Sequence, residues 1–490
     1  MTDAGAAPAA PQPRLKTRTN LAFGIGGMAE TIALYSISQY LMLFYNQVLG
    51  LDAALAGTAM MVSFILDAFV DPIVGSLSDR TRSKLGRRHL YMFAAPIPIA
   101  LCYVAIFNPP GGLSQLELAA WLALTVSALR IAMAFFHTPH LALGGELSKN
   151  YTERSQVMAY NSFFTWAGGS LIVYVALTFF FHKTPEYPFG LRNPDAYAPF
   201  SLFAAGTTLL ILFSSAFFTR DQIPRLPKPA EHLPKFTPFE FLKDIFKVIR
   251  NANYRWLLLG YFFLSLTSGV RGPLTTYMTT YYFELTSEQI RYYIIGSFFG
   301  FLVAFFASAR LHGKYDKKAV MIWSALASLI VPALPVLLRM SGFMFENGDP
   351  RLLPTLVTIA AFSFGTGSVL SITVMSALAD VADENHLRFG VRQEGVLYAT
   401  RAIFAKIDTA LGVYLSGLVL AFVEFPAKAE PGHVDPAILN HLAWIESPIA
   451  MIPGLLAVLF YAQYKITKDS HRLMREKLDM EEVQKVTTPI

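Results

Sequence analysis

Two aspartates stand inside a long apolar segment, in the run FILDAFVDP that begins at Phe64 and ends at Pro72. If this run is helical, Asp67 and Asp71 share one face, with Cβ atoms about 6 Å apart. Two ionised carboxylates at that spacing repel each other, and a small cation or a shared proton removes the repulsion. The pattern predicts a site for a monovalent cation: Na⁺, Li⁺ or H⁺. The alternative is structural, with one aspartate capping a break at Pro72 or pairing with a neighbouring helix.

A lysine lies in an equally apolar setting near the carboxyl end of the chain, where Lys406 interrupts the run AIFAKI. An ammonium group can replace an absent cation beside carboxylates. We therefore expect Lys406 to approach Asp67 and Asp71, or the substrate. The alternative is that Lys406 snorkels or pairs with Asp408, although residues two apart on a helix point to different sides.

Five further polar residues interrupt apolar segments and are weaker candidates for lining a substrate cavity. They are Glu30, Arg130, His137, His140 and Arg271. Ionisable residues within membrane spans are costly, by about 2.5 to 3.5 kcal/mol at a helix centre on insertion scales, and so mark candidate functional sites. Each of the five is equally compatible with a buried structural pair.

The composition requires an apolar environment around these charges. Of the 490 residues, 54% are hydrophobic and 15% charged, which is typical of a polytopic membrane protein. The net charge of +6 is spread in short basic clusters between apolar runs, which excludes a basic nucleic-acid module. The single cysteine, Cys102, excludes a disulfide framework and a thiol metal site. The basic, Ala/Pro-rich start leads straight into an apolar segment, so no cleavable signal peptide is expected.

About 20 apolar residues span the hydrocarbon core as a helix, and this length predicts twelve transmembrane helices. The expected spans are 20–49, 53–80, 89–108, 115–145, 156–182, 198–219, 254–284, 288–311, 319–341, 351–380, 393–424 and 440–464.

The distribution of lysine and arginine predicts the orientation of these spans. Basic residues accumulate before the first span, after the second and after the eighth, whereas the connections GLDAA and NPPGGLSQ contain none. Because cytoplasmic loops are rich in lysine and arginine, both termini are expected in the cytoplasm. The predicted organisation is a tail (1–19), a six-helix bundle (20–219), a basic linker (220–253), a second bundle (254–464) and a tail (465–490).

A faint repeat relates the two predicted bundles. Arg154 and Tyr160 follow the fourth span, and Arg392 and Tyr398 follow the tenth at the same separation. Twelve spans, a central basic linker and repeated halves indicate the major facilitator architecture, in which substrate binds between the bundles near mid-membrane.

Charged clusters at the expected cytoplasmic ends are candidates for a gate between the bundles. They comprise Asp79, Arg80, Arg87 and Arg88 after the second span, and Asp380, Asp383 and Arg392 after the tenth. The alternative is that these residues form solvated loops.

The segments DAFVDPIVGSLSDRTRSKLGRR, from Asp67, and ALADVADENHLRFGVRQEGVLYATRAIFAK, from Ala377, resemble the glycoside-pentoside-hexuronide:cation symporters, the melibiose permease group of major facilitators. The resemblance implies that Asp67 and Asp71 are cation ligands and that Lys406 lies near both the cation and the substrate. It also implies acidic sugar ligands on the first and fourth helices. Those positions here hold Thr31, beside Glu30, and His137, so the usual pair of carboxylates for sugar hydroxyls is expected to be absent.

The sequence therefore predicts a secondary transporter of the cell membrane that couples Na⁺ or H⁺ to a glycoside or another small organic solute. An amphiphile, such as a lysophospholipid or a sterol-like compound, is the alternative substrate. A membrane enzyme is not expected, since no nucleophile–base pair or phosphate loop is evident; a non-transporting sensor stays open. We expect a monomer in the bilayer, with no cofactor beyond the coupling ion, no metal site other than possible Na⁺ at the aspartates, and no nucleic acid.

Overall fold

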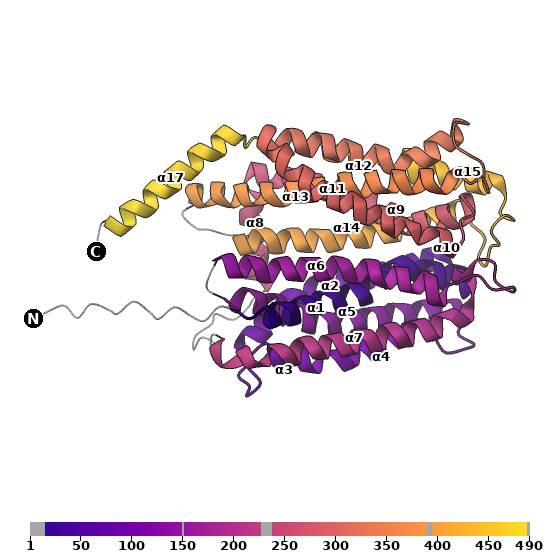
Figure 1. Cartoon of the computed structure of the whole chain (residues 1–490), viewed down its shortest axis with the longest axis horizontal. Coiled ribbons are helices and arrows are strands. Elements are labelled where there is room, and N and C mark those ends of the chain that lie inside the picture. The colour runs from indigo at the N-terminus through magenta and orange to yellow at the C-terminus, as the bar shows by residue number, and fades with distance from the viewer. Residues whose placement is uncertain (1–14, 149–150, 227–237, 390–393, 488–490) are drawn as a thin grey trace, which may run out of the picture.

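The computed structural model describes residues 15–148, 151–226, 238–389 and 394–487, and every regular element in these ranges is helical. Figure 1 shows long helices running side by side, with both chain termini leaving at the same end. We call this the terminal end of the molecule and the opposite end the far end.

The amino-terminal half contains seven α-helices and their π-helical extensions. They are α1 (Thr17–Leu43) with η1 (Phe44–Val48), α2 (Ala53–Arg80), α3 (His89–Ala94), α4 (Pro96–Phe107), α5 (Gln115–Glu146), α6 (Tyr151–Val175) with η2 (Ala176–Phe180), and α7 (Tyr197–Thr219). Short 3-10 turns η3 (Gly190–Arg192), η4 (Pro194–Ala196) and η5 (Arg220–Arg225) flank α7.

The carboxy-terminal half repeats this plan. It contains α9 (Ala252–Tyr277) with η6 (Met278–Tyr282), α10 (Ser287–Ile290), α11 (Tyr292–Lys314), α12 (Lys317–Met340), α13 (Leu352–Phe389), α14 (Glu394–Phe422), and α15 (Pro436–Trp444) joined through η7 (Ile445–Ile449) to α16 (Met451–Tyr461). As in the other half, the first long helix ends in a π-helical turn at the far end.

Eleven helices of the described chain are long and apolar enough to cross a membrane. The segment expected as the third span, 89–108, is divided: α3 ends at Ala94, and α4 begins at Pro96 and covers twelve residues. Proline provides no N–H for the helix ladder, which explains a break at this point.

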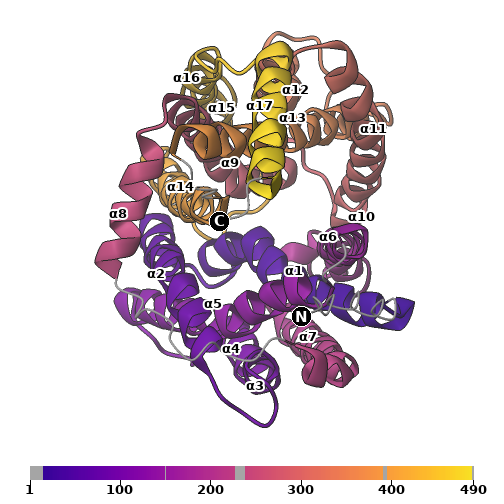
Figure 2. The ribbon, with the colours of Figure 1, turned by 90° about the vertical axis from the view of Figure 1, so that its left-hand side faces the viewer.

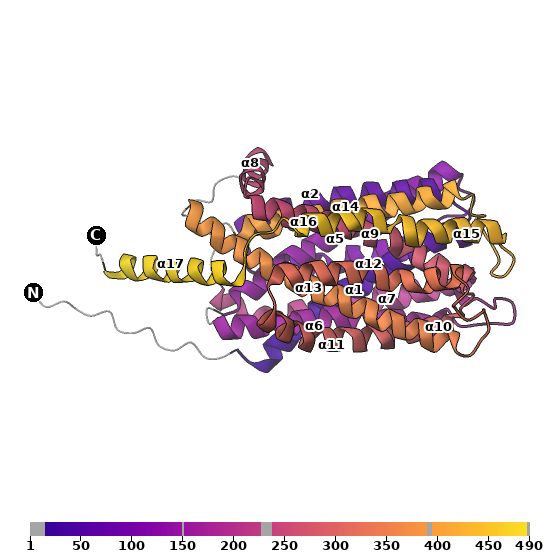
Figure 3. The same cartoon turned by 90° about the horizontal axis from the view of Figure 1, so that it is seen from above.

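Two helices lie where only a linker and a tail were predicted. α8 (Pro238–Ile249) occupies the linker, and α17 (Lys468–Thr487) occupies the tail. Figure 2 shows α8 along one side of the molecule, next to α14 and α2. Figure 3 shows α17 extending beyond the bundle at the terminal end. The α17 sequence is strongly polar, so the criterion of about 20 apolar residues does not predict this helix.

Side-chain caps fix where the helices of the site begin. The Asp52 carboxylate accepts from the backbone N–H of Leu55 at the start of α2. Ser114 and Glu117 form a reciprocal capping box at the start of α5. These caps satisfy backbone donors that have no partner inside a helix, and so set the position of each helix along its axis.

The two halves meet along α2 and α14, which lie side by side in Figure 2. The helices approach closely because glycine faces glycine: a Cβ on Gly57 would lie 3.2 Å from the Cα of Gly417. Small residues of this kind allow membrane helices to pack backbone to backbone. This contact brings Asp67, Asp71 and Lys406 to the same junction.

Candidate cation site between the two halves

Lys406 of α14 reaches across the junction to both aspartates of α2. Its Nζ lies 2.6 Å from Oδ2 of Asp71 and 3.0 Å from Oδ2 of Asp67. It also donates to the backbone carbonyl of Asp67 at 3.3 Å. The three residues singled out in the sequence therefore come together, and the link between them crosses from one half of the molecule to the other.

A second cation, Arg130 of α5, contacts Asp67 from within the amino-terminal half. Its Nη1 donates to Oδ2 of Asp67 at 3.0 Å, and its guanidinium lies 3.5 Å from the centre of the Phe64 ring. Phe64 is buried, so the arginine is held between an aromatic face and a carboxylate. Arg130, a weaker candidate in the sequence, thus belongs to the central site.

The two aspartates differ in what surrounds them. The Asp67 side chain is 9% exposed and has two cationic partners, whereas the Asp71 side chain is 29% exposed and pairs with Lys406. Thr138 donates to Oδ1 of Asp71 at 3.4 Å. Asp71 is therefore the more accessible of the two carboxylates.

Glu30 and His137 form a second polar pair in the same half. Oε2 of Glu30 lies 2.7 Å from Nδ1 of His137, and the two side chains are 21% and 32% exposed. His137 directly precedes Thr138 on α5, whose hydroxyl donates to Asp71. The pair thus neighbours the aspartate–lysine cluster and retains open surface.

The whole chain also matches known proteins. Residues 22–468 match the family model described as MFS/sugar transport protein. The chain belongs to that family. It is 24% identical to the putative glycoside/cation symporter YagG of Escherichia coli (strain K12), with 93% of each chain covered. It is also 24% identical to the isoprimeverose transporter of Lactiplantibacillus pentosus, over 91% of this chain and 88% of the relative.

These matches confirm the resemblance to glycoside-pentoside-hexuronide:cation symporters. The chain is a multi-pass membrane transporter and not an enzyme. The fold also matches a solved bacterial homologue of the human lysosomal transporter Spinster, with a TM-score of 0.61, 13% identity, and coverage of 94% of this chain and 97% of that one.

Two of this transporter's cavity candidates serve packing between helices. The hydroxyl of Thr31 donates to the backbone carbonyl of Thr165 at 2.6 Å, joining α1 to α6. His140 is 1% exposed, stacks on Phe23 with ring centres 4.2 Å apart, and has Nε2 2.8 Å from the Phe23 carbonyl. His140 therefore matches its structural alternative, and the Thr31 hydroxyl is engaged in helix packing.

Arg271 lies away from the aspartates, in the carboxy-terminal half. Its Nε donates to Oε1 of Glu446 at 3.1 Å, and both side chains are at most 10% exposed. This pair joins α9 to η7 within one half. Glu446 was not singled out in the sequence; its place in the apolar run AWIESPIA was the available signal.

The basic cluster after α2 forms ion pairs inside the amino-terminal half. Arg88 contacts Asp79 at 2.5 Å and Glu146 at 2.8 Å, and Arg87 also contacts Glu146 at 2.8 Å. Glu146, the last residue of α5, was not predicted from the sequence, because it lies outside the charged motif that follows α2. Arg80 occupies the last position of α2.

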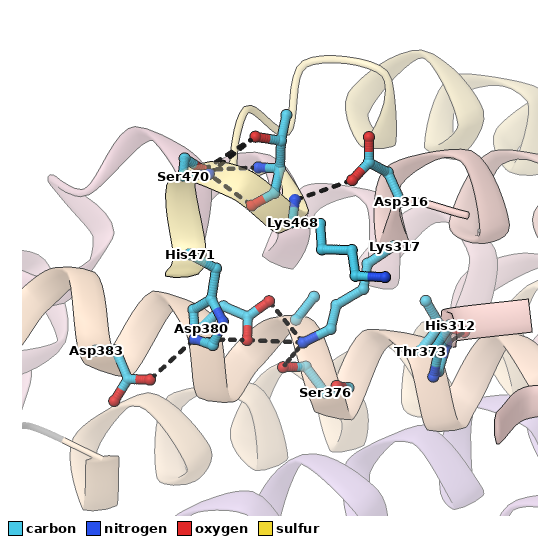
Figure 4. Close-up of polar contacts among 12 residues, drawn as sticks. His312, Asp316, Lys317, Thr373, Ser376, Asp380, Asp383, Lys468, Ser470 and His471 are labelled. Atoms are coloured by element: carbon cyan, nitrogen blue, oxygen red, sulfur yellow. Dashed lines mark hydrogen bonds and ion pairs between the residues drawn. The ribbon is translucent and has the colours of Figure 1, made fainter. Parts of the chain in front are cut away.

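The acidic cluster of α13 forms the corresponding network in the other half (Figure 4). Lys317, at the start of α12, contacts Asp380 at 2.7 Å, just as Arg88 meets Glu146. Asp383 accepts from His471 at 3.2 Å and pairs with Arg475 at 3.0 Å, and both partners come from α17. Arg392, the remaining gate candidate, lies outside the described residues.

At the far end, buried hydrogen bonds join the two halves. The Tyr277 hydroxyl donates to Oδ1 of Asn46 at 2.9 Å, and the Tyr281 hydroxyl donates to Oε1 of Gln47 at 3.0 Å. Nε2 of Gln47 donates to the carbonyl of Pro426 at 3.1 Å. These residues were missed; the signal was the adjacent amides in the apolar run MLFYNQVL.

Proposed function

We propose that the protein carries out symport, in which Na⁺ or H⁺ drives a glycoside or another small organic solute across the membrane by alternating access. The observation that supports this most directly is the ion pair of Lys406 with Asp67 and Asp71. It joins the two halves that must move relative to each other. We further infer twelve crossings in two six-helix bundles (20–219 and 254–464), with α3 and α4 together as the third.

The balance of charges at the two aspartates accounts for a site that binds one monovalent cation. Asp67 and Asp71 contribute two negative charges, and Arg130 and Lys406 contribute two positive charges. A bound cation restores this balance when Lys406 withdraws, because Arg130 remains on Asp67 within the same half. Lys406 and one monovalent cation therefore compete for one place, centred on Asp71.

This competition links ion binding to the movement of the halves. When Lys406 holds α2, the pair resists separation of α2 from α14. A cation on Asp71 releases the lysine and lowers that resistance. For the far end to open, the bonds of Asn46 and Gln47 must also break, whereas the networks around Glu146 and Asp380 remain inside their own halves.

The Glu30–His137 pair is the proposed contact for substrate hydroxyls. A carboxylate accepts two strong hydrogen bonds, and the imidazole pairs with one oxygen of Glu30. The other oxygen is left for a sugar hydroxyl. In this proposal Glu30 provides the carboxylate for sugar hydroxyls on the first helix, because the position that is acidic in the family is Thr31 here.

We infer a location in the cell membrane with both termini in the cytoplasm, and a monomeric unit with no organic cofactor. The terminal end then faces the cytoplasm, and the far end faces outward. The basic residues beside α3, α12 and α17 lie at that terminal end, as cytoplasmic loops require.

Flux in proteoliposomes tests the proposal. Candidate glycosides are first selected by thermal shift with and without Na⁺, because a ligand that binds the folded state raises the melting temperature. We expect uptake of a selected glycoside to rise when an inward Na⁺ or proton gradient is imposed. Binding without flux would indicate a sensor, and flux indifferent to both gradients would overturn the coupling.

A further inference from the structure

A long groove runs along the membrane-facing side of the carboxy-terminal half. α11 and α12 both pack against α13 but scarcely touch each other, which leaves a cavity of about 670 Å³ between them. The floor is made of small residues, where a Cβ on Gly300 would collide with the carbonyl of Ala361. Gly365 continues this floor toward Val369.

The rim of the groove consists of large apolar side chains that face the surroundings. Trp323 is 71% exposed, Phe299 is 56% exposed and Phe362 is 66% exposed. All three belong to helices long and apolar enough to span the membrane. The groove is therefore open to hydrocarbon, with aromatic rings along its edges.

One end of the groove is basic. Leu311, Tyr315 and Ala319 line it at the terminal end, and Arg310, Lys314 and Lys318 adjoin these three residues in the chain. Within the described residues none of these three cations has an ion-pair partner, whereas their neighbour Lys317 is bound to Asp380 (Figure 4). Asp316, the nearby acid, accepts from the backbone N–H of Lys468 at 2.9 Å.

We propose that this groove is a binding site for an anionic glycerophospholipid, with an acyl chain along the floor and the phosphate among Arg310, Lys314 and Lys318. Hydrocarbon already surrounds the groove, so selectivity arises from the headgroup charge. Anionic lipids attract basic residues at the membrane surface. This attraction adds to the packing of a flexible acyl chain in the groove. The site is separate from the aspartate–lysine cluster.

A transmembrane helix of a second copy is the competing occupant, because small residues also suit helix packing. The charges favour the lipid. A second helix ending here would leave three unpaired cations beside it unless it brought acidic residues, whereas a phospholipid supplies the anion and the apolar chain in one molecule.

Tryptophan fluorescence in nanodiscs tests the proposal with the full-length protein. The probes are phosphatidylglycerol and phosphatidylcholine brominated on one acyl chain, each diluted into unbrominated phosphatidylcholine. The contribution of Trp323, one of five tryptophans, is obtained by subtracting the emission of Trp323→Phe. We expect half-maximal quenching at an at least threefold lower fraction of phosphatidylglycerol than of phosphatidylcholine.

Two variants locate the two parts of the lipid. Arg310→Gln/Lys314→Gln/Lys318→Gln is expected to remove the preference, while Arg82→Gln/Lys84→Gln, which changes exposed basic residues of the other half, preserves it. Ala307→Phe fills the groove and is expected to reduce quenching by both lipids, whereas Leu302→Phe, outside the groove lining, leaves it unchanged. Melting temperatures confirm that each variant is folded.

Equal quenching by the two lipids would overturn the proposal. A second outcome would also overturn it: both lipids quench Trp323 in nanodiscs that contain one copy of the protein, but neither quenches it in nanodiscs that contain two copies. That result would assign the groove to a second copy. Preservation of the preference in the triple variant would refute the headgroup assignment.

Discussion

Nζ of Lys406 lies 2.6 Å from Oδ2 of Asp71, and this contact joins α14 of one half to α2 of the other. Arg130 contacts the neighbouring Asp67 from inside the amino-terminal half. Asp67 therefore has a partner in its own half, whereas the ion-pair partner of Asp71 belongs to the opposite half.

Asp71→Asn is expected to abolish gradient-driven uptake, with at least a tenfold loss, while facilitated exchange of substrate persists. The amide cannot hold the cation that replaces Lys406, so coupling is lost although the substrate can still cross the protein. Proteoliposome flux with and without an ion gradient measures both quantities. Asp195→Asn, an exposed far-end change, is the control, and full coupling in Asp71→Asn would refute the site.

Lys406→Gln is expected to tighten cation binding about tenfold, which corresponds to about 1.4 kcal/mol. The variant lacks the internal competitor, and the uncompensated aspartate attracts the ion. Calorimetric titration of the purified protein with NaCl, or the pH dependence of melting if the ion is H⁺, gives the affinity. Weaker cation binding would mean that Lys406 supports the ion site instead of competing for it.

Arg130→Gln is expected to lower the free energy of unfolding by about 3 to 5 kcal/mol, because it leaves the charge of Asp67 buried with less compensation. Thermal unfolding in detergent measures the loss. Asp67→Asn added to Arg130→Gln should recover part of it, since the uncompensated charge is then gone. A double variant no more stable than Arg130→Gln would show that the arginine acts mainly through its packing on Phe64.

Tyr277→Phe and Tyr281→Phe are each expected to weaken the far-end contact by about 1 kcal/mol, the net contribution of a typical hydrogen bond. Hydrogen exchange of 44–48 and 278–282 should accelerate about fivefold. Tyr197→Phe is the matched control, because the Tyr197 hydroxyl donates to the backbone carbonyl of Leu191 inside one half and lies outside both segments. Unchanged exchange in both tyrosine variants would show that these hydrogen bonds do not hold the far end closed.

His471→Ala/Arg475→Ala is expected to loosen α17 from α13, because it removes the contact of His471 with Asp383, seen in Figure 4, and the ion pair of Arg475 with Asp383. At about 1 kcal/mol for partly exposed ion pairs, exchange along α17 rises about fivefold. The control is Arg472→Ala, whose ion-pair partners Asp469 and Glu476 lie within α17. Equal exchange in the two variants would show that α17 is held by other contacts.

The sequence by itself determined eleven of the twelve expected spans and the central charges. Spans are readable because the bilayer requires about 20 apolar residues per crossing, and each intramembrane charge is visible against that background. Asp67, Asp71 and Lys406 were found in this way. The helices α8 and α17 were not, since neither needs to cross the membrane.

The sequence left open whether Lys406 meets the aspartates or the substrate, and it did not predict the pairing of Arg130 with Asp67; the tertiary structure decided both. Arg130 and Asp67 are 63 positions apart, and Lys406 and Asp71 are 335 apart. Glycine contacts between α2 and α14 bring the latter pair together, and no local pattern encodes such a contact. The same holds for Tyr277, whose buried hydroxyl donates across the junction to Asn46 of the other half.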